Sequence, residues 1–152
     1  MEPLPFTERS HSSAALAPSG GRIAAGVLEG GRYVVRLLDL ARRTDDIIEM
    51  PGINWSPVWN PGGTRIAIRS MVKGDFDVYA KDVATAAPPV LLLSTPRDES
   101  PMAWLSERKL AISQADETGV YRTKQLDLDT PAKLASIADY NPDSMALSPD
   151  RR

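Results

Sequence analysis

The amino-acid sequence predicts an all-β fold built from repeated four-stranded antiparallel sheets, and three observations lead to that prediction. Thirteen prolines and ten glycines interrupt the 152 residues, so few stretches can hold a long helix. The runs between these breakers are short and rich in Val, Ile, Leu and Tyr, which favours strands. A motif also recurs every 43 to 45 residues, the period of four-stranded blades. A partial β-propeller accounts for all three.

The repeat is clearest in residues 17–24 and 60–67, where a Pro/Gly turn precedes Arg-Ile-Ala. A weaker copy follows at 105–112, and a fourth begins at 146–150. One apolar anchor residue lies just before or at each turn. These anchors, spaced 43, 45 and 43 residues apart, are Leu16, Trp59, Trp104 and Leu147.

Each repeat contains four predicted strands in the same order. The first follows the turn, at 22–28, 65–70 and 109–114. A hairpin leads to the second, at 32–40, 76–82 and 120–128, and a polar link to the third, at 46–50, 90–94 and 133–137. The fourth reaches the next anchor, at 54–59, 100–104 and 144–147. In 76–82 apolar and other residues alternate, and a period of two is typical of a strand.

These strands divide the chain into predicted blades at 15–57, 58–101 and 102–145, with residues 146–152 starting another. Residues 1–14 are predicted to end in the last strand of a preceding blade. Closed propellers typically have four to eight blades, so we expect about three to be part of a larger ring or to assemble from several chains.

Blades without neighbours would expose apolar faces. We expect such faces on the first and third blades, and self-association through them is the predicted consequence. The residues assigned to these faces are Ile23, Val27, Val35, Leu37, Leu110, Ile112, Leu126 and Leu134.

The second repeat resembles that of TolB-like and WD-repeat-like propellers. In the TolB-like family a blade reads W-S-P-D-G-x-x-I-A-F, followed by Gly, an aspartate, an aliphatic and an aromatic residue, and a later aspartate. Residues 59–68 follow the first part, and Asp77, Val78, Tyr79 and Asp82 match the second. The resemblance extends from about residue 15 to 152. It is weakest in the third repeat, where 105–108 lack both Pro and Gly.

The resemblance implies a non-catalytic module that binds or senses a protein or peptide partner. Such modules include periplasmic TolB and the propeller extensions of bacterial serine/threonine kinases. The alternative is the gating propeller of a prolyl-oligopeptidase-like serine peptidase whose catalytic domain is absent. The sequence itself does not identify a compartment, and the resemblance favours a periplasmic or other extracytoplasmic one.

Composition argues against several other functions. The net charge is −2, and nucleic-acid binding needs a concentrated basic surface, so no nucleic-acid partner is predicted. The apolar run at 88–93 is far shorter than the ~18 residues of a membrane helix, so no membrane insertion is predicted. The first residues show no basic-then-apolar secretory signal. Without cysteine there are no disulfides or thiolate metal sites, and no cofactor is expected.

The candidate site residues are few. A single histidine, His11, cannot build a multi-histidine metal centre, and no G-x-S-x-G nucleophile elbow is present, so no catalytic residue is predicted. Asp75 and Asp77 share a strand face and could serve a cation such as Ca²⁺, but we expect them to be structural, as we do the aspartates at 45–46 and at 127 and 129.

The tryptophans divide into two groups. Trp59 and Trp104 are anchors of the repeat and are predicted to be buried. Trp55 lies off that register, and we predict it as a possible partner contact.

Overall fold

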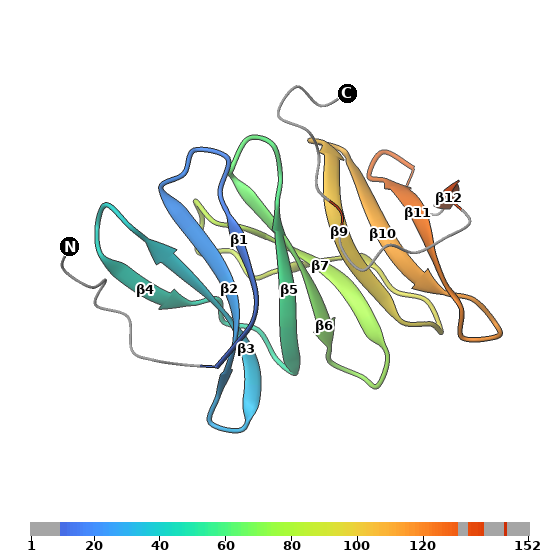
Figure 1. Cartoon of the computed structure of the whole chain (residues 1–152), viewed down its shortest axis with the longest axis horizontal. Helices are drawn as coiled ribbons and strands as arrows, with labels where there is room; N and C mark the ends of the chain where they lie inside the picture. The colour runs from blue at the N-terminus through green and yellow to red at the C-terminus, as the bar shows by residue number, and fades with distance from the viewer. Residues whose placement is uncertain (1–9, 131–133, 139–144, 146–152) are drawn as a thin grey trace.

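The structure, a computed structural model, describes residues 10–130, 134–138 and 145. Within these residues the chain forms three four-stranded antiparallel sheets and no helix, as predicted. In each sheet the strands follow chain order, because short turns join antiparallel neighbours. The three sheets lie side by side, and the first strand of the middle sheet contacts the first strand of each flanking sheet (Figure 1).

The strand bounds are as follows. The first sheet contains β1 (Ser10–Leu16), β2 (Arg22–Glu29), β3 (Arg32–Asp39) and β4 (Thr44–Ile47). The second contains β5 (Ile53–Trp59), β6 (Arg65–Met71), β7 (Phe76–Asp82) and β8 (Val90–Leu93). The third contains β9 (Glu99–Ser106), β10 (Lys109–Ala115), β11 (Tyr121–Asp127) and β12 (Leu134–Ala138).

The sheets do not coincide with the predicted blade boundaries. The strands that carry Leu16, Trp59 and Trp104 each begin a sheet. Leu16 pairs with Ile23 across the Pro/Gly turn, and Trp59 pairs with Ile66. Residues 10–14 therefore belong to the first sheet, and the prediction that 1–14 end a preceding blade is wrong for them. The short turn after the anchor closes a hairpin, whereas the longer link before the anchor strand crosses to the next sheet. Residues 146–152 lie outside the described part of the chain.

Two apolar clusters hold the sheets together. One lies between the first and second sheets, and the other between the second and third. The first contains Ala17, Ala24, Val35, Ile48, Trp59, Ile66 and Ile68. The second contains Ala67, Val78, Leu93, Trp104, Leu110, Ile112 and Leu126. Because neighbouring residues of a strand point to opposite faces, β6 serves both clusters, with Ile66 and Ile68 on one face and Ala67 on the other.

The anchor tryptophans repeat one docking arrangement. As predicted, Trp59 and Trp104 are buried, with 8% and 2% of their surface exposed. The indole N–H of Trp59 donates to the Ala15 carbonyl of the preceding sheet at 2.9 Å, and that of Trp104 to the Val58 carbonyl at 3.1 Å. An arginine of the preceding sheet stacks on each ring, with distances to the centroid of 5.2 Å for Arg22 on Trp59 and 5.3 Å for Arg65 on Trp104. The second and third blades therefore each contact the preceding blade through the same indole hydrogen bond and the same arginine–tryptophan pair.

The apolar faces assigned to the two ends need correction. Val35 and Leu37 face the second sheet, and so do Leu110, Ile112, Leu126 and Leu134. Only Ile23 and Val27 lie on the opposite face of the first sheet, in a small cluster with Ala25 and Leu38. The prediction grouped residues of opposite parity, although side chains alternate between the two faces of a sheet.

On the third sheet, the face that points away from the second carries small or polar residues such as Ala111, Ser113 and Thr123. This face therefore lacks the large apolar side chains that were predicted for it.

The weak third turn has a structural role. Glu107 accepts hydrogen bonds from the Asn60 side-chain amide and from the Gly62 N–H, the latter at 2.7 Å, so the third turn clasps the second. Asn60 also accepts from the N–H groups of Thr64 and Arg65 at 2.9 and 2.7 Å, which fixes its own turn. The replacement of Pro and Gly by a glutamate thus creates an inter-blade contact.

Candidate functional site

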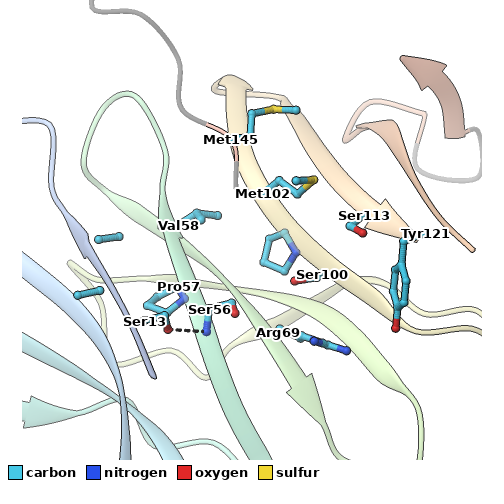
Figure 2. A pocket seen from close by; sticks show the side chains of 13 residues that line it. Ser13, Ser56, Pro57, Val58, Arg69, Ser100, Met102, Ser113, Tyr121 and Met145 are labelled. Carbon is cyan, nitrogen blue, oxygen red and sulfur yellow. Dashed lines mark hydrogen bonds between the residues drawn. The ribbon is translucent and has the colours of Figure 1, made fainter. Parts of the chain in front are cut away.

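An open hollow of about 650 Å³ lies on the side of the molecule where β1, β5 and β9 meet (Figure 2). Among the described strands these three are the edges of their sheets, and each is hydrogen-bonded to one neighbouring strand. Edge strands keep main-chain groups available to a partner. The hollow is lined by Ser13, Ala14, Ala15, Ser56, Pro57, Val58, Arg69, Ser100, Pro101, Met102, Ser113, Tyr121 and Met145.

Each of the three edge strands contributes a serine to the hollow. Ser13 pairs with Gly26 and Ser100 with Ser113, whereas Ser56 lies where the register of β5 breaks between Trp55 and Val58. The Ser13 hydroxyl oxygen accepts a hydrogen bond from the Ser56 N–H at 3.1 Å, which links β1 to β5 inside the hollow. In the described part of the chain, no imidazole or carboxylate is hydrogen-bonded to these hydroxyls, and such a base is what activates a serine nucleophile.

A β-bulge shapes the floor of the hollow. The register of β5 against β6 breaks between Trp55 and Val58, and Ser56 adopts a left-handed backbone with φ of 52°. Such a conformation costs a residue other than glycine about 1–3 kcal/mol and persists only where surrounding contacts hold it. Bulges of this kind redirect side chains at binding sites. Here the bulge brings Ser56 and Pro57 into the hollow.

Arg69 of β6 is the one charged residue in the lining. Its guanidinium lies 3.9 Å from the Phe76 ring centroid and 5.3 Å from that of Trp55. Its Nε is buried, and no described residue hydrogen-bonds to it. Figure 2 shows Arg69 below Ser100 among the side chains that line the hollow.

Trp55, predicted as a partner contact, is half-buried at the edge of this site. It packs between Tyr33, at 5.4 Å between ring centroids, and Phe76, at 4.8 Å. With Ser12, Tyr33 and Ser56 it lines a second, smaller hollow of about 380 Å³. Nothing in the structure tests a partner contact at Trp55, which stays a prediction.

A buried carboxylate lies next to the hollow. Glu99, which precedes Ser100 in β9, is fully buried and accepts hydrogen bonds from the Thr95 hydroxyl and, at 2.9 Å, from the Gln114 amide. Burial raises the pKa of Glu99, and these hydrogen bonds only partly oppose the rise. Lys124 reaches Gln114 at 2.6 Å and extends the chain of hydrogen bonds. Sequence reasoning missed this glutamate because an acidic residue before a Ser-Pro pair is typical of a loop.

The acidic residues considered from sequence do not converge. Asp75 is exposed, whereas Asp77 is buried. Asp45 instead binds the Arg36 guanidinium at 2.5 Å, and Asp129 pairs with Arg108. No group of three His, Cys, Asp or Glu residues within the described ranges could hold a metal ion.

The remaining candidate, His11, lies partly outside what is described. Its backbone pairs with Val27 in β1, and its side chain is not among the described groups. Within the described ranges, no helix has the length and apolar content needed to cross a bilayer.

Comparison with known proteins identifies the fold. No model of a known protein family matches the sequence, and a search of curated proteins found no match. Among solved structures, TolB from Acinetobacter baumannii gives a TM-score of 0.76 over 93% of this chain and 36% of its own, at 20% identity. A protein described as TolB from Agrobacterium tumefaciens gives 0.72 over 83% of this chain and 45% of its own, at 18% identity.

The β-propeller domain of the trilobed protease from Pyrococcus furiosus, which has an open velcro topology, gives 0.62 over 89% of this chain and 43% of its own, at 16% identity. At such identities the likeness concerns the fold alone. The chain has a TolB-like β-propeller fold, of which the described residues form three blades. It spans less than half the length of each of these proteins.

Proposed function

We propose that this chain is a non-catalytic binding or sensing module that holds a protein or peptide segment in the hollow of its edge strands. One observation carries the proposal: the hollow combines the edges of three sheets with hydroxyls and with the apolar surfaces of Pro57, Pro101 and Met102. A peptide needs both main-chain partners and apolar contacts. The TolB-like fold further supports a part in a larger bacterial propeller protein, acting in the periplasm or another extracytoplasmic compartment.

The proposal includes the absence of catalysis. Propellers carry their functions on loops and on the central face, and the same fold serves binding proteins and enzymes. Support comes from the serines of the hollow, whose described hydrogen bonds involve main-chain groups rather than a base. We expect no turnover above blank when the chain is incubated with generic peptidase, kinase or polysaccharide-lyase substrates.

A peptide selection followed by a blocking variant tests the proposed site. Displayed random decapeptides are selected against the 152-residue chain, and the selected peptides are measured by fluorescence anisotropy. We expect Ser100→Phe to fill the hollow and to reduce affinity at least about tenfold. Ser94→Phe is the matched control, because Ser94 is exposed and lies outside the hollow. Equal affinity of the two variants would contradict the assignment of the site.

The trilobed-protease propeller keeps a second function open. In that case the chain is the gating propeller of a serine peptidase and the hollow is a passage for substrate rather than a binding site. A passage binds peptides weakly and without sequence preference. The encoded sequence on either side distinguishes the two: a hydrolase domain downstream favours the gating role, and a kinase with a membrane helix upstream favours the sensing role.

A further inference from the structure

Arg69 brings a positive charge into the hollow without an acidic partner. Within the described residues no carboxylate pairs with it, and its buried Nε has no hydrogen-bond acceptor. The arginines that do pair with carboxylates show the contrast: Arg36 with Glu29 and Asp45, Arg42 with Asp39, Arg97 with Glu117, Arg108 with Asp129, and Arg122 with Asp116. A buried donor that lacks an acceptor is costly unless water or a ligand supplies one.

Two aromatic rings hold the guanidinium in place. Phe76 and Trp55 attract its faces through their ring electrons, at centroid distances of 3.9 and 5.3 Å. The Nε–H is buried, so the donors left for a ligand are those of the two terminal nitrogens, which are not among the buried unpartnered atoms. A planar, pre-oriented fork of donors matches the two oxygens of a carboxylate.

The surroundings of Arg69 favour an anion. None of the residues that line the hollow is acidic, and the hydroxyls of Ser56 and Ser100 offer further donors. Two acids adjoin the lining, and both already accept hydrogen bonds. Asp98 accepts from the Phe76 N–H at 3.1 Å and from the Tyr121 hydroxyl at 3.3 Å, and Glu99, which precedes Ser100, accepts from Thr95 and Gln114. The apolar wall formed by Pro57, Pro101 and Met102 suits the uncharged part of the same ligand.

We propose that Arg69 binds a carboxylate group of the ligand held in this hollow. The proposal rests on the proposed function, since it names the group by which a bound peptide is recognised. That carboxylate is either the free carboxyl terminus of the peptide or the side chain of an aspartate or glutamate. Both present the same two oxygens, and the experiment separates them.

The first test uses small probes and the NMR signals of arginine side chains in the 152-residue chain. The probes are N-acetyl-leucine, with a terminal carboxylate; its neutral amide; and N-acetyl-glutamic acid α-amide, with a side-chain carboxylate. We expect at least one carboxylate probe to shift the Arg69 Nε–Hε signal saturably, and the neutral amide to leave it in place. A shift that grows linearly with every salt and is shared by all arginines would overturn the proposal, because it reports ionic strength only.

The second test uses the selected peptides and variants of Arg69. We expect Arg69→Gln to weaken binding by about tenfold to a hundredfold, the range for losing one charge-assisted hydrogen-bonded pair. Arg69→Lys keeps the positive charge and the fold but loses the forked N–H donors of the guanidinium. We therefore expect this variant, too, to bind the peptides with lower affinity. Arg97→Gln is the matched control, because Arg97 lies outside the hollow. Thermal melts establish that each variant is folded.

The outcomes separate this proposal from the proposed function. If Ser100→Phe blocks peptide binding but Arg69→Gln and amidation of the peptide terminus change nothing, the carboxylate site is refuted and the binding module stands. If carboxylate probes shift Arg69 saturably but no peptide binds, the peptide-binding function is refuted and the carboxylate site stands. If peptides are bound through an internal acidic residue, amidation of their terminus has no effect whereas replacing that residue by its amide weakens binding.

Discussion

Individual polar residues between the blades act in opposite ways on stability. Asn54 is buried and donates its side-chain amide to the carbonyls of Met50, Pro51 and Gly52 at 3.2–3.3 Å, which fixes the link between the first two sheets. Glu99 occupies the corresponding place before the third sheet but is a carboxylate. Both side chains keep one oxygen buried without a hydrogen-bond partner in the described structure, Oδ1 of Asn54 and Oε2 of Glu99, so the difference between them is the charge. An amide suits this place, whereas an ionised carboxylate is penalised there by lost hydration.

The pKa of Glu99 leads to a prediction about pH. Because the folded pKa lies above the ordinary value of about 4.5, the folded chain binds this proton more tightly than the unfolded chain. The ionised glutamate therefore lowers stability above both pKa values, and the penalty disappears as the pH falls through the folded pKa towards 4.5. We expect Glu99→Gln to melt higher than wild type at neutral pH, by about 2–4 °C per kcal/mol of penalty removed.

Thermal melts between pH 4 and pH 8 check this expectation. The gain from Glu99→Gln should shrink as the pH falls, since the wild-type side chain becomes neutral as well. Glu117→Gln is the control, because the Glu117 side chain is 86% exposed. A variant that is less stable than wild type by the same amount at every pH would mean that the carboxylate is stabilising.

At the scale of elements, the Pro/Gly turn and the anchor strand form the repeating device of the fold. The anchor tryptophan packs against the preceding sheet. There its indole N–H donates to a main-chain carbonyl, and an arginine side chain lies over its ring. The first anchor is the informative exception: Leu16 is 60% exposed, and no described residue gives it the cover that Trp59 and Trp104 have. The contacts of the anchor thus come from the neighbouring blade and not from its own.

This arrangement predicts how the anchor responds to substitution. Trp59→Ala empties a large aromatic site and should lower the free energy of unfolding by about 3–5 kcal/mol. Trp59→Phe keeps most of the packing but loses the hydrogen bond to the Ala15 carbonyl, so about 1 kcal/mol is expected. Urea denaturation measures both, with Tyr121→Phe, at a half-buried ring, as a comparison. If Trp59→Ala lowers the free energy of unfolding by less than about 1 kcal/mol, Trp59 is not an anchor of the fold.

Sequence patterns predicted these elements well because their causes are local. Turn residues and the alternation in 76–82 identify strands, and the predicted strand at 76–82 matches β7. The grouping of strands was out of phase by one strand, since the repeat gives the period but not the sheet in which a period begins. The candidate site was beyond sequence reasoning; Trp55 lies at its edge, and its role as a partner contact stays a prediction. Arg69, Phe76 and Ser100 come from three strands and two sheets, and their spacing along the chain does not predict that they lie close together.

At the scale of the whole molecule, the three blades form a row whose two ends differ. The outer face of the third sheet presents small or polar residues such as Ser113 and Thr123, both buried. The outer side of the first sheet instead carries Leu16 beside Ile23, its partner in the β1–β2 hairpin. In a row of repeats the stability comes from contacts between neighbouring units, so an end with an exposed anchor is the place where a further unit gains most.

We therefore propose that any self-association of the chain proceeds through the first blade, at Leu16. Replacing this 60% exposed leucine by serine removes apolar surface at the very position where the other anchors bury theirs. Val90→Ser provides the matched control, because Val90 is 61% exposed but lies in β8, the outer strand of the middle sheet. Size exclusion with light scattering should show wild type and Val90→Ser associating with rising concentration and Leu16→Ser remaining monomeric. If wild type is monomeric at every concentration, Leu16 is no association site; if Leu16→Ser associates as strongly as wild type, the contact lies elsewhere on the chain.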